Sequence, residues 1–320
     1  MGVKVDIVAG FLGAGKTTLI NKLVPAYTKK EKVVLIENEF GEIGIDGDLL
    51  SGALPTREIY AGCICCTLAG NFIEAIEEMN QQFHPDRIVI EPSGVGQLSD
   101  VMRACQGVKG TAQLDLNHLI TIVDGTGFKD DLDAFGAFYL DQIRYANILL
   151  LSHLAQVEQQ EIDQVISELK TRNGHAVILV DDWRDMENED LADLLEAVRP
   201  QGPDRIPKPE PPVHHDHHHL PADRIFSVWG QRNPTVTTMQ QLNSALERLG
   251  DTAYGQIWRA KGMVELAEGG WAYFDYTPGH CSSRPMDSAK EAKIAVIGCQ
   301  LNRERLGEIF PAQDHGEKSK

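Results

Sequence analysis

The sequence predicts an α/β fold with a mostly parallel sheet covered by helices on both faces, followed by a smaller α+β domain. Through the first 200 residues, short apolar runs alternate with helix-length amphipathic runs. The apolar runs are rich in Val, Ile and Leu at successive positions, as expected for strands buried on both sides. Beyond residue 200 the composition changes abruptly to proline and histidine. Together these observations predict two domains joined by a linker.

The predicted elements of the first domain follow from this alternation. Strands are expected at residues 4–9, 33–37, 87–91, 119–123, 148–151 and 176–180. Helices are expected at residues 16–27, 69–83, 158–172 and 189–198.

The second domain is predicted from four further apolar runs and two amphipathic runs. Strands are expected at 224–229, 257–266, 271–276 and 292–298, and helices at 238–249 and 303–310. We predict a nucleotide-binding domain at 1–200, a linker at 201–222, an α+β domain at 223–312 and a disordered tail at 313–320.

Charge and hydropathy exclude several classes of partner. The formal net charge is −17, which repels nucleic-acid phosphates and anionic lipid surfaces, although solubility alone also accounts for it. The sequence has no run of 18 apolar residues, and its first residues lack the apolar core of a signal peptide. We therefore expect a cytoplasmic protein without a nucleic-acid or membrane partner, with a homodimer left open.

A glycine-rich motif follows the first predicted strand: residues 10–17 match G-x-x-x-x-G-K-[ST] and open the first predicted helix. The glycines let backbone amides turn inward around an anion, and the helix start adds its positive end. A fortuitous glycine-rich turn is the alternative. The motif makes the predicted fold that of a P-loop NTPase. The predicted phosphate-binding residues are Gly10, Gly13, Ala14, Gly15, Lys16, Thr17 and Thr18, with Lys16 reaching the β- and γ-phosphates as a catalytic residue.

A P-loop also needs an acidic residue near its magnesium ion. Glu91 ends the strand 87–91, at the edge where a parallel sheet presents its carboxyl ends to ligands. We predict that Glu91 and the Thr17 hydroxyl hold Mg²⁺, and that Gly94 brings its amide to the γ-phosphate. A strand-end turn without a ligand is the alternative.

Two further segments carry metal-binding chemistry. Cys63, Cys65 and Cys66 precede a predicted helix, and three thiols at this spacing can converge on one soft or borderline cation. Glu37, Glu39 and Glu42 follow the second predicted strand, which we interpret as a switch loop between magnesium and a transported metal. A thiol cluster without metal and a solvated acidic loop remain the alternatives.

Taken together, these segments resemble the CobW-like GTPases, relatives of the urease and hydrogenase nickel-insertion GTPases. The resemblance covers nearly the whole chain. It rests on the phosphate loop, the stretches 37–42, 62–66 and 91–94, Asp141-Gln142-Ile143, the histidine-rich linker and the ends of the second domain at 258–262 and 297–298.

The resemblance implies a metallochaperone that binds zinc or cobalt, hydrolyses GTP and delivers the metal to a client protein. Carried onto this sequence, it makes Cys63, Cys65 and Cys66 metal ligands, with Glu37 and Glu42 as candidates beside them. Thiolates favour Zn²⁺ or Co²⁺ over Mg²⁺, so the two kinds of metal can occupy neighbouring sites. An assembly or reactivation factor for a corrinoid enzyme and a metal buffer with a vestigial nucleotide site are the alternative functions.

The sequence departs from the family in its base-recognition segment. Family members have Lys-x-Asp after the fifth strand, whereas here Ser152 is followed by His153, Leu154 and Ala155. Ser152 remains a predicted nucleotide contact, but the carboxylate that accepts from guanine N1 and N2 is lost, which removes much of the discrimination between purines. ATP use or relaxed specificity is therefore predicted beside GTP, with residues 181 and 182 as substitute carboxylates.

A histidine run lies in the proline-rich linker. Neutral imidazoles bind Zn²⁺ and Co²⁺, and a linker without fixed geometry predicts weak capture at several sites. An incidental polar linker is the alternative. The histidines are His214, His215, His217, His218 and His219.

The predicted mechanism couples these parts. The γ-phosphate orders the segment from Glu37 to Glu42 and brings the cysteines into a metal-binding arrangement, and hydrolysis releases it. Glu39 is a catalytic candidate for orienting the attacking water.

Overall fold

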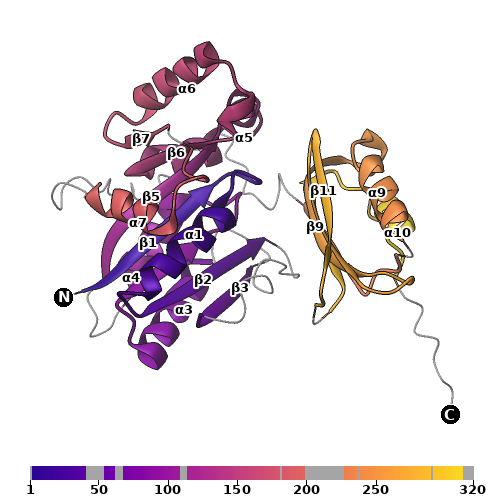
Figure 1. Ribbon diagram of the computed structural model, residues 1–320, viewed down its shortest axis with the longest axis horizontal. Coiled ribbons are helices and arrows are strands. Elements are labelled where there is room, and N and C mark those ends of the chain that lie inside the picture. The colour runs from indigo at the N-terminus through magenta and orange to yellow at the C-terminus, as the bar shows by residue number, and fades with distance from the viewer. Residues whose placement is uncertain are drawn as a thin grey trace. The chain divides into compact units, whose positions relative to one another are not determined.

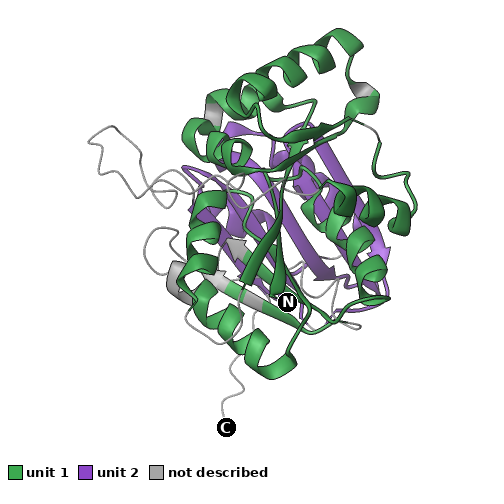
Figure 2. Cartoon of the chain, turned by 90° about the vertical axis from the view of Figure 1, so that its left-hand side faces the viewer, with its two compact units in different colours: residues 1–39, 50–219 green, residues 40–49, 220–320 purple. Residues whose placement is uncertain are grey.

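The computed structural model describes residues 2–40, 54–61, 68–108, 114–180, 182–198, 227–236, 238–289 and 291–312. Contacts divide the chain into two compact units, one of residues 1–39 with 50–219 and one of residues 40–49 with 220–320 (Figure 2). The predicted linker lies outside the described residues, so the domain bounds stay a prediction.

The first unit is built on a seven-stranded sheet (Figure 1). The strands have the order β3-β2-β4-β1-β5-β6-β7, and β1 pairs in parallel with both β4 and β5. The β2–β4, β5–β6 and β6–β7 pairs are parallel as well, which confirms the predicted fold class. The strands are β1 (Val3–Gly10), β2 (Val33–Phe40), β3 (Thr56–Ala61), β4 (Arg87–Glu91), β5 (Leu114–Asp124), β6 (Ile148–Ser152) and β7 (Val177–Leu179).

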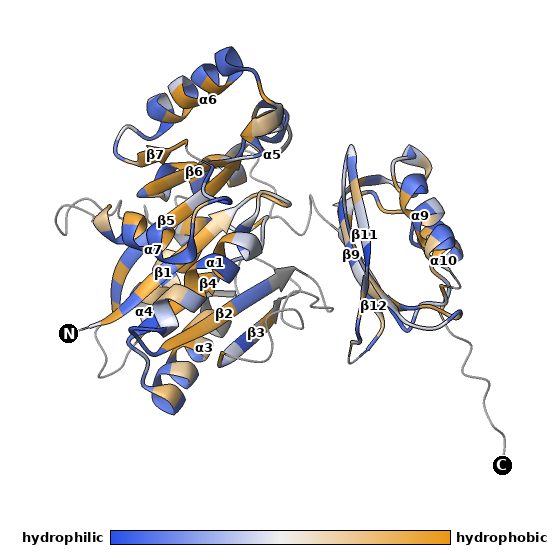
Figure 3. Cartoon of the chain, viewed as in Figure 1, coloured by the Kyte–Doolittle hydropathy of each residue, from blue (hydrophilic) through white to orange (hydrophobic). Residues whose placement is uncertain are grey.

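Helices cover both faces of this sheet. One core cluster joins α1 and α7 to residues of β1, β4, β5 and β6, while α3, α4 and α5 contact one another in sequence, and α4 and α5 also contact β1 and β5. Figure 3 shows hydrophobic stretches in the strands of this sheet, β6 among them, as burial on both faces requires. Among the described residues, no helix is both long and apolar enough to cross a bilayer. The helices are α1 (Lys16–Thr28), α3 (Leu68–Phe83), α4 (Leu98–Gly107), α5 (Phe128–Tyr145), α6 (Gln159–Arg172) and α7 (Asn188–Ala197), with a 3₁₀ turn η1 (Leu154–Gln156).

Several elements were not predicted from the sequence, namely β3, α4, α5 and one strand of the second unit, β11 (His280–Met286). The α5 helix contains Gly136 with a φ of 38°, a kink that interrupts the helical periodicity. The β11 strand is polar and lies at an edge of its sheet, so the alternation that marks a half-buried strand is missing.

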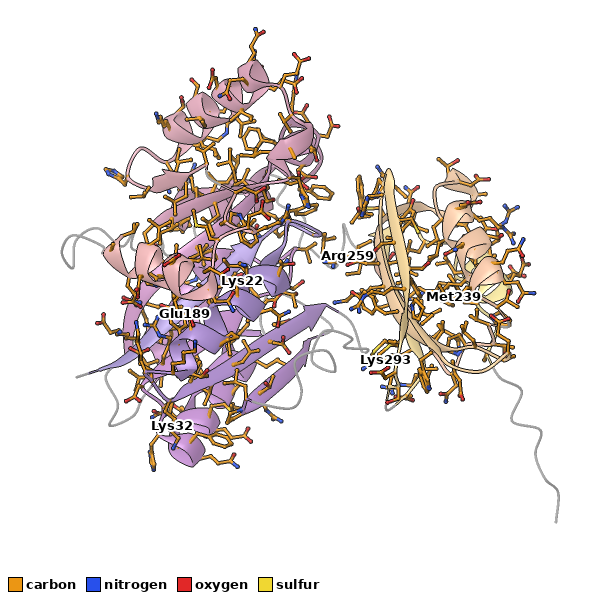
Figure 4. All side chains as sticks on the ribbon, in the orientation of Figure 1. Lys22, Lys32, Glu189, Met239, Arg259 and Lys293 are labelled. Carbon is orange, nitrogen blue, oxygen red and sulfur yellow. The ribbon has the colours of Figure 1, made fainter. Side chains whose placement is uncertain are left out.

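The second unit is a five-stranded antiparallel sheet with two helices, in agreement with the predicted α+β domain. Its order is β11-β10-β9-β12-β8, and its core includes Phe274 and Phe310, whose rings stack with centroids 6.2 Å apart. Figure 4 shows Met239 on the helical side of this unit, and Arg259 and Lys293 on the other side of the sheet. The remaining elements are β8 (Ser227–Arg232), α9 (Met239–Arg248), η2 (Thr252–Tyr254), β9 (Gln256–Glu265), β10 (Trp271–Thr277), β12 (Lys293–Cys299) and α10 (Arg303–Ile309).

A buried ion network fixes the amino ends of β1 and β4. The Arg87 guanidinium is buried and forms ion pairs with Asp6, Glu31 and Glu196. Its carbon also lies 3.9 Å from the centroid of the Tyr27 ring, a cation–π contact with α1. The buried Arg87 guanidinium at the start of β4 therefore contacts Asp6 of β1 and Tyr27 of α1. It also pairs with the carboxylates of Glu31 and Glu196.

Asp6 is the second centre of this network. Its Oδ1 accepts hydrogen bonds from Asn117 Nδ2 (2.8 Å) and the His118 backbone amide (3.1 Å), where the β1–β5 register shifts in a bulge. Burial alone would raise the pKa of the Asp6 carboxyl, but the His118 hydrogen bond and charge, with Arg87 and Asn117, hold it at about 2. The ionised form of Asp6 therefore stabilises the folded state above pH 4.

We predict that Asp6→Asn lowers the free energy of unfolding at pH 7 by about 3 kcal/mol, because it removes one partner of a buried ion pair. The folded pKa is depressed, so the contribution of Asp6 is present above its unfolded pKa near 4 and is lost as the pH falls toward 2. Urea denaturation of wild type and variant between pH 7 and pH 2 measures this, and the stability difference should shrink below pH 4. Asp163→Asn, an exposed carboxylate on α6, is the control; a constant Asp6→Asn difference across this range would contradict the assignment.

Candidate functional site

Three glycines with positive φ angles, Gly10, Gly13 and Gly15, bend the segment from the end of β1 to the start of α1 into a tight loop. Gly10 has a φ of 150°, and a Cβ there would lie 2.8 Å from the Ile122 backbone oxygen in β5. Gly15 has a φ of 113° and is the N-cap of α1. The loop therefore bends back over the amino end of α1, the arrangement in which backbone amides and the helix dipole converge on an anion.

Lys16 places a positive charge inside this loop. The side chain is buried, and its Nζ donates to the backbone oxygens of Gly10 (3.0 Å) and Phe11 (3.2 Å). Phosphate oxygens offer the same ammonium stronger, charged acceptors. The structure therefore places Lys16 where the sequence motif requires it.

Thr17 and Glu91 come together beside the loop, from α1 and the end of β4. The Thr17 hydroxyl donates to the Glu91 carboxylate, with Oγ1 to Oε1 and Oε2 distances of 3.1 and 3.4 Å. Mg²⁺ binds oxygen ligands at about 2.0–2.1 Å in an octahedron, in which adjacent ligands lie about 3 Å apart. The separation and the hard oxygen donors therefore fit the predicted magnesium ion.

Gly94 approaches the loop from the turn that follows β4. A Cβ at this residue would meet Leu12 Cδ2 at 2.7 Å, the Leu12 backbone nitrogen at 3.0 Å and Lys16 Nζ at 3.1 Å. Gln142 supports the turn from α5, where its Nε2 donates to the backbone oxygens of Gly96 (2.7 Å) and Gly94 (3.3 Å). Gly94 is a residue predicted from the sequence, whereas Gln142 belongs only to a segment that resembles the family and carries no predicted contact.

Glu37 lies next to this site on β2. The β2–β4 register pairs Glu37 with Glu91, and the Glu37 side chain is 3% exposed. Paired residues of neighbouring parallel strands point to the same face, so the two carboxylates are neighbours. The strand that leads toward Glu39 and Glu42 therefore passes beside the predicted magnesium ligands.

Several predicted metal ligands lie outside the described part of the chain or lack a described side chain. Within the described ranges, no group of three or more His, Cys, Asp and Glu residues is placed to hold a metal ion. Glu39 belongs to β2, but its side chain is not described. The residues outside the described ranges are Glu42, Cys63, Cys65, Cys66, His214, His215, His217, His218 and His219.

Ser152 and the phosphate loop are joined at the other side of the site. The Ser152 side chain is buried, and its Oγ donates to the Ala14 backbone oxygen at 2.9 Å. This bond ties the end of β6 to the loop. The hydroxyl therefore positions the loop in the described structure, while Thr18, one residue past Thr17, is exposed on α1.

Beside Ser152 lies a chain of polar contacts that sequence reasoning did not find. The His153 ring accepts or donates at both nitrogens: Nδ1 lies 2.8 Å from Asp124 Oδ2, and Nε2 lies 2.8 Å from Arg184 Nη2. A Cβ on Gly15 would lie 3.3 Å from that same Arg184 nitrogen. The three residues come from the ends of β5 and β6 and from the segment after β7, so no short sequence motif contains all three.

Burial and neighbouring groups shift the pKa values of two carboxyl groups at the end of the site near His153. Burial would raise the pKa of the Asp124 carboxyl, but hydrogen bonds from His153 and Thr126 outweigh it and lower the value. The neighbouring Asp131 has a pKa raised to about 7, first by burial and then by the charges of Asp124 and Asp130. The Asp124 carboxylate is therefore the ionised group at this position.

These features define a P-loop nucleotide-binding protein. A glycine-rich loop joins the first strand to the first helix and surrounds Lys16, and Thr17 of that helix pairs with Glu91 at the end of β4. Comparison with known families agrees. The family described as "CobW/HypB/UreG, nucleotide-binding domain" matches residues 4–180, and the cobalamin synthesis protein CobW C-terminal domain matches residues 226–312. The chain belongs to the CobW/HypB/UreG family, which confirms the resemblance found in the sequence.

Individual relatives match the chain at low identity. The zinc chaperone YeiR of Escherichia coli is 32% identical over 173 residues, which are 53% of this chain and 52% of YeiR, so the chain spans about half of that relative's length. The zinc chaperone CobW of Pseudomonas aeruginosa is 26% identical over 345 residues, covering 93% of this chain and 88% of that protein. The crystal structure of Zn(II)-bound YjiA GTPase from E. coli is 19% identical over 97% of this chain and 98% of that one, with a TM-score of 0.43.

We predict that Gly94→Ala weakens binding of a magnesium–nucleoside triphosphate by about tenfold or more, because the added methyl group overlaps Leu12 and Lys16 at the phosphate loop. Isothermal titration calorimetry measures the effect, with thermal unfolding as a check on the fold. Gly307→Ala on α10 is a matched control, since nothing lies within 4 Å of the added Cβ, and it should bind nucleotide as wild type does. Equal affinity of Gly94→Ala and wild type would show that the turn after β4 does not contact the nucleotide.

Proposed function

We propose that this chain binds and hydrolyses a nucleoside triphosphate and couples that cycle to binding a transition metal, zinc or cobalt, and delivering it to a client protein in the cytoplasm. The proposed nucleotide is GTP, with ATP as a second substrate. The names of the relatives, which include zinc chaperones and a zinc-regulated GTPase metalloprotein activator of Schizosaccharomyces pombe, support a metal-delivering GTPase.

One observation carries this proposal: Glu37 and Glu91 are register partners in β2 and β4. Glu91 accepts from Thr17 at the phosphate loop, while Glu37 begins the acidic stretch of the chain that includes Glu39 and Glu42. A change in charge at the phosphate end therefore acts directly on the strand that leads into that stretch. This is the physical link that coupling between nucleotide and metal requires.

The described residues supply the parts of phosphoryl transfer that depend on position and charge. The amides of the phosphate loop bind the phosphates, the Lys16 ammonium moves from the loop oxygens to the β- and γ-phosphates, and the Gly94 amide faces the γ-phosphate. Thr17 and Glu91 would hold a magnesium ion, which supplies neutralising charge when bound. Glu39 is the proposed residue for orienting the attacking water.

The cargo site is proposed on donor chemistry. Cys63, Cys65 and Cys66 supply soft thiolates that favour zinc or cobalt, with Glu37 and Glu42 as neighbouring oxygen donors and the linker histidines as weak capture sites. The zinc-chaperone names of the relatives favour metal delivery over assembly of a corrinoid enzyme. The intact geometry of Lys16 and Thr17 argues against a metal buffer whose nucleotide site is vestigial.

The nucleotide half of the proposal predicts that Lys16→Ala reduces affinity for GTP and ATP by more than about 100-fold, since charge-assisted hydrogen bonds to phosphate are lost. Thr17→Ala should bind nucleotide but lose the dependence of phosphate release on Mg²⁺. Calorimetry and a phosphate-release assay measure the two effects. Lys22→Ala, from the same helix (Figure 4), is the control and should behave as wild type. Unchanged nucleotide binding by Lys16→Ala would end the proposal.

The metal half predicts that Cys65→Ser or Cys66→Ser weakens binding of Zn²⁺ and Co²⁺ by more than about 100-fold, because even changes outside the ligand shell cost 10–100-fold. Competition with a chromophoric chelator measures the affinity, and Co²⁺ absorption reports thiolate ligation. Cys281→Ser, an exposed cysteine in the second unit, is the control. Both variants should still bind GTP; full zinc and cobalt affinity in both would refute the cargo site.

A further inference from the structure

The phosphate loop has two ends that the structure distinguishes. Thr17, Glu91 and Gly94 lie on the side of β1 that faces β4, and they define where the γ-phosphate and its metal belong. On the other side of β1 the sheet continues through β5, β6 and β7. The nucleoside of a bound nucleotide must therefore extend toward the carboxyl ends of those three strands.

At that end the contacts of His153 determine its protonation. Arg184 has only N–H donors and no acceptor, so in the 2.8 Å contact the His153 Nε2 is the acceptor. The ring proton then lies on Nδ1 and is donated to Asp124 Oδ2, also at 2.8 Å. His153 is thus a neutral ring held by a carboxylate on one side, and it aims the Arg184 guanidinium from the other.

Arg184 is also fixed against the phosphate loop. Its Nη2 lies 3.3 Å, and the buried Trp183 ring 3.5 Å, from the position that a Cβ on Gly15 would occupy. The Trp183 Nε1 donates to the Leu151 backbone oxygen at 3.0 Å, which anchors the segment after β7 to β6. The guanidinium is therefore held beside Gly15, the N-cap of α1, at the nucleoside side of the loop.

Two carboxylates described around His153 already accept hydrogen bonds. Asp124 Oδ1 accepts from the Thr126 amide (2.9 Å) and hydroxyl (2.7 Å), and Oδ2 accepts from His153. Asp182 Oδ1 accepts from the Arg184 backbone amide at 3.3 Å. Specific recognition of guanine needs a carboxylate that is free to accept hydrogen bonds from two N–H groups of the base. A planar guanidinium, in contrast, stacks on any purine.

We propose that Arg184, positioned by the neutral His153 and by Asp124, contacts the face of the nucleotide base and takes the place of the Lys-x-Asp reader of the family. This inference rests on the proposed function, because it requires a nucleotide in the site. It names Arg184 as the base-contacting residue and His153 as a positioning residue. The site then binds purine nucleoside triphosphates by their phosphates and by the plane of the base, with little discrimination between guanine and adenine.

The test compares three ligands by calorimetry in the presence of Mg²⁺: GTP, ATP and inorganic tripolyphosphate, which has no base. Arg184→Ala should weaken both nucleotides by roughly 3- to 30-fold, the range of a desolvated cation–π contact, and leave tripolyphosphate unchanged. Arg184→Lys keeps the charge without the plane and should restore only part of the loss. Arg172→Ala, a salt-bridged arginine on α6, is the matched control and should match wild type for all three ligands.

His153→Ala tests positioning separately from folding. It should weaken GTP and ATP but not tripolyphosphate, and the double variant with Arg184→Ala should bind no more weakly than Arg184→Ala alone, since the ring acts through the guanidinium. Additive losses would show that His153 acts independently and overturn its assigned role. GTP and ATP dissociation constants for wild type should lie within about tenfold of each other.

Several outcomes overturn the inference. Unchanged nucleotide binding by Arg184→Ala would show that Arg184 does not contact the base. An equal loss of tripolyphosphate affinity would show that Arg184 is a phosphate ligand instead. A guanine preference of 100-fold or more that survives in Arg184→Ala shows that another group reads the base edge. Each of these leaves the proposed function standing, whereas a wild-type protein that binds neither nucleotide nor tripolyphosphate overturns both.

Discussion

The conformation of the short segment between β1 and α1 is the constraint on which the site depends. Three glycines with positive φ angles turn the chain back across the start of the helix, and the Gly10 turn leaves no room for a side chain against β5. The consequence is a tight ring of backbone around the Lys16 ammonium, which donates to the Gly10 and Phe11 oxygens. Everything else described at the site approaches this ring from neighbouring strands: Glu91 and Gly94 from β4, and Ser152 from β6.

The order of the strands then gives the ring a direction. Because β1 is central, with β4 on one side and β5 on the other, the residues proposed to contact the terminal phosphate and those proposed to contact the nucleoside are separated by the strand itself. The charged groups on the two sides of β1 also differ. Carboxylates of β2 and β4 suit a divalent cation, while the other side presents a guanidinium held by a neutral imidazole. The two sides are therefore chemically specialised although both are short polar stretches at strand ends.

The sequence predicted the parts of this site that are local. The motif from Gly10 to Thr17, and Glu91 with Gly94 at a strand end, are continuous segments whose spacing carries their chemistry. Most strands and helices were also predicted, because burial on both faces produces long apolar runs. What escaped prediction is assembled from distant segments: Gln142 beneath the turn after β4, and Arg184 brought to His153 by the pairing of β6 with β7. The kink at Gly136 and the polar edge strand β11 escaped for a different reason, since neither keeps the periodicity of its element.

The buried arginine network bears on a part of the molecule that it does not touch. Arg87 begins the same five-residue strand that Glu91 ends, so the two lie about 13 Å apart along an extended backbone. Pinning Arg87 between β1 and α1 fixes the stagger of β4 against its neighbours, and a slip of a single residue would turn Glu91 to the opposite face of the sheet. The ion pairs of Arg87 at the opposite rim of the sheet thus help to position the Glu91 carboxylate. Substitutions at that rim would alter the alignment of the candidate site even where every residue of the site itself is retained.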